Sequence, residues 1–109
     1  MQNPRSAKYW KEKLQMESHV EGGAFRETYR AGLTFPQQVL TPAHTGERNA
    51  STAIYFLLEH GDFSAFHRIA SDEMWHYYDG ACLHIYEIKP NGTLLIHKLG
   101  LDIEACEQP

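Results

Sequence analysis

Short polar turns interrupt the second half of the chain at close intervals, and they constrain its fold more than any other feature. Asp79-Gly80 and Asn91-Gly92 each separate two apolar-rich segments, and the Glu-His-Gly-Asp stretch at 59–62 separates another pair. Asp-Gly and Asn-Gly favour the positive φ angles that tight hairpins need. From residue 50 onward the sequence therefore predicts consecutive antiparallel hairpins, as in an all-β sandwich or barrel.

The segments between these turns alternate apolar and polar residues with the period of a strand. Strands are predicted over residues 24–30, 52–58, 63–69, 73–78, 82–88 and 93–99. The segment 52–58 (TAIYFLL) is apolar on both faces, which predicts a central, covered strand. Residues 31–50 are richer in turn residues, so a loop with a short strand around Val39 and Leu40 is expected there.

One short amphipathic helix is predicted ahead of the strands. Ser6 is a suitable N-cap, and Ala7, Trp10 and Leu14 recur at the spacing of one helix face. The helix is expected to end before Gly22-Gly23, the simplest role of which is a bend at the entry to a strand.

Composition limits the classes of partner. The 109 residues (1–109) suffice for a single domain, and 42% hydrophobic with 22% charged residues is ordinary for a soluble protein. A net charge of -4 gives no electrostatic reason to expect nucleic acid, and no apolar run approaches the ~20 residues that span a membrane. Without a secretory signal at the N-terminus, a cytoplasmic location with reduced cysteines is expected.

The stretch "GDFSAFHRIASDEMWHYYDG" (61–80) contains the residues best suited to chemistry. Alternation along the two predicted strands turns His67 and Glu73 inward, beside Phe63, Trp75 and Tyr77. An imidazole titrates near neutrality and can move a proton to or from a bound molecule, and an adjacent carboxylate can orient it or act as acid. Two charged groups on inward faces indicate a cavity lined by polar side chains, which could hold a ligand.

The spacing of these residues resembles the first signature motif of the cupin superfamily. Gly61, His67, Glu73 and Gly80 occupy its fixed positions, and Ile69 stands where cupins usually carry a second histidine. Three further blocks, "HVEGGAFRETYR", "STAIYFLL" and "FHRIASDEMWHYYDG", resemble those of a small, uncharacterised cupin family that reads HPEGG, FRETY, STAIYFLL and SDE-x-WH. Val20 replaces the usual proline of the first block.

The resemblance implies an all-β cupin jelly-roll β-barrel (double-stranded β-helix), commonly a homodimer. This fold is similar in architecture to sugar-nucleotide epimerases, germins and storage proteins. The resemblance does not imply a specific reaction. Cupins close the barrel with a second motif, and the sequence ends at "CEQP", where that segment would begin. A barrel without those strands would expose unpaired edges, so we expect dimerisation or strand exchange, or else a truncated form of marginal stability.

A metal cofactor is not predicted, because a catalytic transition-metal site usually needs three protein ligands. His67 and Glu73 supply two, Ile69 cannot coordinate, and alternation sends His76 to the opposite face. A divalent ion held by His67 and Glu73 remains an alternative. His84 and His97 would approach only if the strand register favoured them.

The function predicted from the sequence is binding of a small polar metabolite, with metal-independent isomerase or epimerase chemistry by His67 and Glu73 as one version of it. A metal-dependent cupin enzyme and a non-catalytic binding or storage protein are the alternatives, so enzymatic activity is left open. The predicted ligand-contacting residues are Arg26, Glu27, Trp75 and Tyr77. Arg26 and Glu27 point to opposite faces of one strand, so only one of them would face the cavity.

Overall fold

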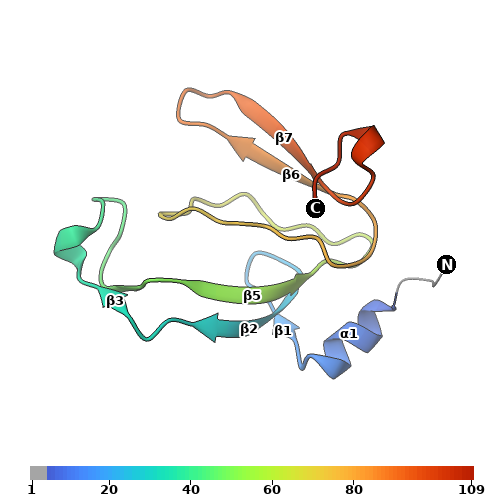
Figure 1. Cartoon of the computed structure of the whole chain (residues 1–109), viewed down its shortest axis with the longest axis horizontal. Coiled ribbons are helices and arrows are strands. Elements are labelled where there is room, and N and C mark those ends of the chain that lie inside the picture. The colour runs from blue at the N-terminus through green and yellow to red at the C-terminus, as the bar shows by residue number, and fades with distance from the viewer. Residues whose placement is uncertain (1–4) are drawn as a thin grey trace. The chain divides into compact units, whose positions relative to one another are not determined.

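A computed structural model describes residues 5–109 of the chain (Figure 1). They divide into two compact units, and each is described by itself. The N-terminal unit comprises residues 6–72, and the C-terminal unit comprises residues 73–109 together with Arg5. Among the described residues, no helix is long and apolar enough to cross a membrane.

The N-terminal unit begins with the predicted helix, α1 (Ala7–Lys13). Ser6 is its N-cap, as predicted: its Oγ accepts the backbone N–H of Tyr9 at 3.1 Å, which satisfies one of the free donors of the first turn. Lys11 donates from Nζ to Glu59 Oε2 at 2.8 Å. This hydrogen bond is the main reason that the pKa of Lys11 is raised, and it ties the helix to the end of the following sheet.

A three-stranded antiparallel sheet in the order β1-β2-β5 follows, made of β1 (Glu17–Ser18), β2 (Ala24–Arg30) and β5 (Thr52–Leu57). The bounds of β2 match the predicted strand. The prediction of a covered, central strand at 52–58 is wrong, because β5 has only β2 beside it within residues 5–109. Ile54 and Tyr55 are accordingly 44% and 38% exposed.

Beyond β2 the chain makes a small sheet of β3 (Thr34–Phe35) and β4 (Arg48–Asn49), separated by the 3₁₀ helix η1 (Gln37–Val39). The predicted strand at Val39 and Leu40 is therefore wrong. Pro36 is the N-cap of η1, and its carbonyl accepts the Val39 N–H at 3.1 Å. The φ angle of proline is fixed near the value that a helical turn needs. This preference outweighs the preference of valine for strands.

Residues 63–69 and 73–78, the two predicted strands that carry His67 and Glu73, form no regular strand. In the first segment the backbone N–H of Ala65 bonds the Glu21 carbonyl oxygen at 2.8 Å, a single contact rather than a ladder. Alternation indicates which side of an extended segment is apolar. A strand also needs a neighbour to pair with, which local sequence does not encode.

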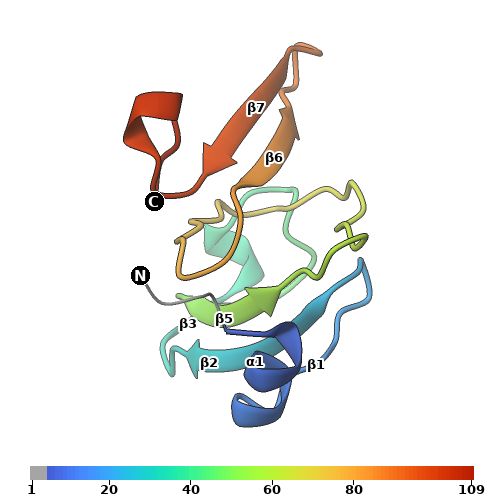
Figure 2. The same cartoon turned by 90° about the vertical axis from the view of Figure 1, so that its right-hand side faces the viewer.

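The C-terminal unit contains one hairpin, β6 (Leu83–Ile88) and β7 (Leu94–Leu99), followed by the 3₁₀ helix η2 (Ile103–Ala105) (Figure 2). The predicted Asn91-Gly92 turn joins the strands, and Gly92 takes a φ of +86°. One face of the hairpin carries Tyr86, Ile88, Leu94 and Ile96, which are between 49% and 61% exposed.

Candidate functional site

His67 lies on the extended segment 63–69 of the N-terminal unit, and its side chain is exposed. Its Nδ1 is 2.8 Å from the backbone carbonyl oxygen of Ala65. A carbonyl oxygen can only accept, so Nδ1 carries the proton in this contact and Nε2 of the neutral ring carries the lone pair. Within residues 5–109 nothing hydrogen-bonds Nε2. The contact therefore fixes the ring in the tautomer that a proton acceptor requires.

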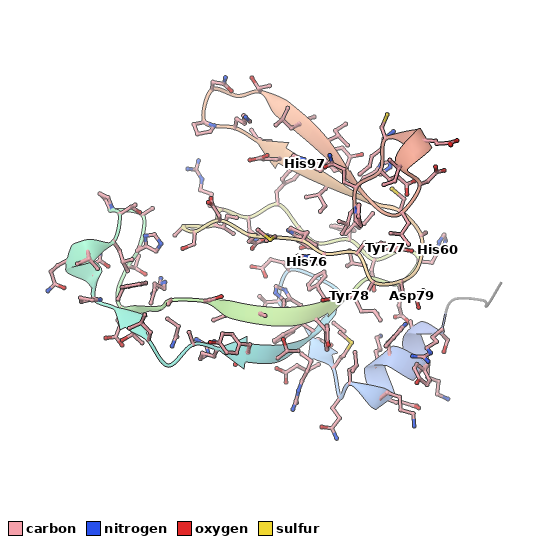
Figure 3. The ribbon with its side chains drawn as sticks, viewed as in Figure 1. His60, His76, Tyr77, Tyr78, Asp79 and His97 are labelled. Carbon is pink, nitrogen blue, oxygen red and sulfur yellow. The ribbon has the colours of Figure 1, made fainter. Side chains whose placement is uncertain are left out.

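Glu73 and two predicted ligand-contacting residues lie in the C-terminal unit. Glu73 Oε2 accepts the indole N–H of Trp75 at 3.2 Å, and the Tyr77 hydroxyl donates to the Gly80 carbonyl oxygen. Figure 3 places Tyr77 on the same stretch as Tyr78 and Asp79. His67 belongs to the other unit, so its predicted pairing with Glu73 stays a prediction from the sequence.

Arg26 and Glu27 lie on opposite faces of β2, as predicted. Arg26 is opposite Tyr55 in the register, and Glu27 is opposite Ile54. Glu27 Oε1 is 2.5 Å from Arg30 Nη2, and this contact is the main cause of the raised pKa of Arg30. Regular alternation along 24–30 would place Arg30 on the face of Arg26, but the register shifts between Glu27 and Tyr29 and carries Arg30 to the face of Glu27.

The loop after η1 carries a buried histidine that sequence reasoning missed, and its ring reaches the segment before Glu73. His44 is 7% exposed. Its Nδ1 is 2.8 Å from Thr41 Oγ1, and its Nε2 is 2.8 Å from Ser71 Oγ. Hydroxyl groups both donate and accept, so the two contacts satisfy the ring in either tautomer. The cluster joins two distant segments of the N-terminal unit, and it leaves neither ring nitrogen for a ligand.

The loop between β1 and β2 holds a histidine–carboxylate contact that was also missed as a site. His19 Nδ1 lies 2.9 Å from Glu21 Oε2. The signal in the sequence was the His-Val-Glu-Gly-Gly run, in which a histidine and a glutamate two residues apart precede two glycines. Residues two apart already share one face of an extended segment, and the glycine turn that follows allows the carboxylate to lie against the ring.

Within residues 5–109, no group of three or more histidine, cysteine, aspartate or glutamate side chains lies in a position to hold a metal ion.

Comparison with known proteins gives a consistent family relationship. The family model described as "Cupin superfamily (DUF985)" matches residues 8–109. A crystal structure of a protein from Shewanella oneidensis is 41% identical, with a TM-score of 0.82, and the match covers 100% of this chain and 61% of that one. A hypothetical protein from Leishmania major is 27% identical with a TM-score of 0.80, covering 94% of this chain and 61% of that one.

The chain thus spans about three fifths of the length of these two solved structures. No curated protein matches it.

Proposed function

Because this chain belongs to the cupin superfamily, in the family described as DUF985, we propose that it binds a small polar metabolite through His67. The observation that carries the proposal is the fixed tautomer of that ring. The Ala65 carbonyl holds the proton at Nδ1, which leaves an exposed lone pair at Nε2. A ligand hydroxyl, or a C–H made acidic by a neighbouring carbonyl, is the group such a nitrogen accepts a proton from.

The proposed chemistry is metal-independent proton transfer of the isomerase or epimerase kind. His67 acts as the base, and Glu73 orients it or returns the proton. The Trp75 indole N–H engages Oε2 of Glu73, which supports a fixed carboxylate with Oε1 left for a partner. The proposal that His67 and Glu73 face one another is based on the sequence pattern. The proposal of a jelly-roll barrel around them has the same basis.

Binding is tested by thermal shift with a named panel of D-glucose, D-fructose, D-ribose, their phosphate esters and L-lactate. We expect at least one compound to raise the melting temperature of the wild-type protein, and we expect His67→Gln to abolish that rise. His84→Gln is the matched control, since His84 is exposed on β6 in the other unit. If a compound raises the melting temperatures of both variants equally, His67 is not part of the binding site.

Proton transfer is tested separately by NMR of the bound compound in D₂O. Exchange of a carbon-bound hydrogen that disappears in His67→Gln supports the isomerase version. Binding without exchange identifies a non-catalytic binding protein. Stoichiometric metal by elemental analysis, lost in His67→Ala, would replace the proposal with the metal-dependent one.

We also propose that the protein is a homodimer. The apolar face of the β6–β7 hairpin supports this, because exposed groups of large apolar side chains mark contact surfaces. Light scattering coupled to size exclusion gives the mass in solution. Ile88→Lys is expected to convert a dimer to a monomer if this face forms the contact, whereas a wild-type monomer would refute the proposal.

A further inference from the structure

The His19–Glu21 contact is held in a compact turn. The His19 N–H donates to the Gly23 carbonyl oxygen at 2.9 Å, and the Gly22 N–H donates to the His19 carbonyl oxygen at 3.1 Å. The side chains of His19 and Glu21 are 23% and 30% exposed. Both groups are therefore restrained by the turn and still reachable from solvent.

Two aromatic rings fix the imidazole of His19. The ring centroids of Phe25 and Phe56 each lie 5.2 Å from its own, at interplanar angles of 79° and 78°. The two phenylalanines are opposite each other in the register of β2 and β5, so both project from one face of the sheet. An imidazole packed edge-to-face on two rings has little freedom to rotate, which preorganises it toward a ligand.

One ring nitrogen of His19 has two competing neighbours. Nδ1 lies 2.9 Å from Glu21 Oε2, and the backbone N–H of Glu21 points at the same nitrogen from 3.1 Å. An imidazole nitrogen has either one proton or one lone pair, so it can satisfy only one of these partners. With the proton it donates to the carboxylate, and without the proton it accepts the backbone N–H. The position of the Glu21 carboxylate is thereby linked to the tautomer of the ring.

The turn is docked on the segment that carries His67, within the same unit. The Glu21 carbonyl oxygen accepts the Ala65 N–H at 2.8 Å, and the Ala65 carbonyl oxygen accepts from His67 Nδ1 at 2.8 Å. Gly22 approaches so closely that a Cβ there would overlap the Phe63 carbonyl oxygen. Within residues 5–109 the Nε2 atoms of His19 and His67 make no hydrogen bond.

We propose that His19 is a second proton-accepting residue for the same ligand, with Glu21 as its positioning residue. This rests on the proposed function, since the ligand is the same polar metabolite. A hydrogen bond to a charged carboxylate is stronger than one from a neutral backbone N–H, so in this proposal the carboxylate holds the proton at Nδ1 and Nε2 presents its lone pair to a ligand hydroxyl. A nitrogen oriented by a carboxylate on the far side of its ring is the arrangement that activates a hydroxyl group in nucleophilic and acid–base sites. A polyhydroxylated compound supplies hydroxyls for His19 and His67 together.

The first test needs no ligand and is therefore independent of the proposed function. Long-range ¹H–¹⁵N NMR of the full chain reports the tautomer of each histidine. At slightly alkaline pH we expect His19 with its proton on Nδ1, and we expect Glu21→Gln to move the proton to Nε2, because the backbone N–H then claims Nδ1. A wild-type ring protonated at Nε2 would overturn the assignment of Glu21.

Labelling with diethyl pyrocarbonate, which reacts with an unprotonated ring nitrogen, gives the second readout. Mass spectrometry should find His19 labelled, with the rate lowered about five-fold in Glu21→Gln as the lone pair moves to the enclosed nitrogen. The control pair is His97 and Glu87, which also lie 2.9 Å apart, with side chains 50% and 52% exposed. No aromatic contact fixes that ring in the described chain, so Glu87→Gln should change His97 labelling by less than about two-fold. Equal effects in both pairs would overturn the proposal.

The third test uses the compound that binds best in the thermal-shift panel. His19→Asn keeps an oxygen that can accept the Glu21 N–H, so the turn is retained while Nε2 is lost. We expect a folded protein with a somewhat lower melting temperature, because the ring contacts with Phe25 and Phe56 are lost, and an affinity at least about ten-fold weaker, with His60→Asn as control. Unchanged affinity in a folded His19→Asn refutes the role of His19. If no panel compound binds the wild type, the proposed function fails, and the NMR and labelling results still decide on the pair.

Discussion

Arg30 forms an ion pair with Glu27 from three residues further along the same strand. In a regular strand these positions point to opposite faces. The register of β2 against β5 explains the contact: Glu27 pairs with Ile54 and Tyr29 pairs with Ala53, which leaves Thr28 without a partner. This β-bulge reverses the alternation beyond Glu27, and bulges commonly serve to redirect a side chain.

The bulge can be removed by deleting Thr28. With Thr28 gone, Glu27 and Tyr29 become consecutive and can still pair with Ile54 and Ala53, so Arg30 should stay on the face of Glu27, and the free energy of unfolding should fall by no more than about 1 kcal/mol. Urea denaturation measures the change. Thr28→Ala is the control: it removes only the hydrogen bond from Oγ1 to the Ala53 carbonyl oxygen and keeps the bulge. A deletion far more harmful than the control, or one that separates Arg30 from Glu27, would contradict this account.

The close approach of the β1–β2 turn to the chain at Phe63 predicts a large effect at one glycine. In Gly22→Ala the new Cβ would overlap the Phe63 carbonyl oxygen, at a φ of +117° that side chains rarely adopt. We expect a loss of about 3 kcal/mol or more in unfolding free energy, or failure to fold. Thermal unfolding followed by circular dichroism checks this.

Gly61→Ala separates strain from overlap. Gly61 has a φ of +87°, but nothing lies within 4 Å of its would-be Cβ. That variant should lose only the ~1–2 kcal/mol of left-handed backbone strain. Similar losses at the two glycines would mean that contact with Phe63 is unimportant.

The sequence predicted those parts of the fold that local chemistry determines. The N-cap at Ser6, the full extent of β2 and the Asn91-Gly92 hairpin are confirmed. Each depends on residues adjacent in the chain: a hydroxyl at a helix start, an unbroken alternation, or a dipeptide that favours positive φ. The bulge at Thr28 and the unpaired segments 63–69 and 73–78 depend on what lies alongside, and alternation carries no information about that.

The same limit applies to the candidate site. The motif around His67 was visible as a spacing, and the ring's tautomer followed only from the backbone carbonyl two residues before it. His44 gave no signal at all, since its partner Ser71 lies 27 residues further along the chain and meets it only through tertiary structure. The sequence indicated a functional histidine only at His67, where a known motif surrounds it.

The buried ring of His44 should contribute to stability rather than to chemistry. His44→Ala leaves the hydroxyls of Thr41 and Ser71 without their partner and opens a space at a position that is 7% exposed. We expect a loss of about 2 kcal/mol in unfolding free energy, and about 1 kcal/mol for Ser71→Ala, measured by urea denaturation. Binding of the panel compounds to folded His44→Ala protein should be unchanged. Weaker binding at preserved stability would assign His44 to the site instead.

The two cysteines should differ in reactivity because of their surroundings in the C-terminal unit. Burial raises the pKa of the half-buried Cys82 thiol, and the Glu107 carboxylate raises it further. Cys106 is exposed. Because the thiolate is the reactive form, iodoacetamide at mildly alkaline pH should alkylate Cys106 faster than Cys82. Glu107→Gln should speed the reaction of Cys82 by lowering its pKa, and it should leave Cys106 the faster of the two.

The raised pKa of Cys82 also fixes the sign of a pH effect on folding. The unfolded thiol loses its proton at about pH 8.5, before the folded one does. Its contribution to stability is therefore complete below that pH and is lost as the pH rises through the higher folded pKa. Melting temperatures measured from pH 7 to 10 should fall less steeply in Cys82→Ser than in the wild type. Parallel curves for the two proteins would show that the shifted thiol is not linked to folding.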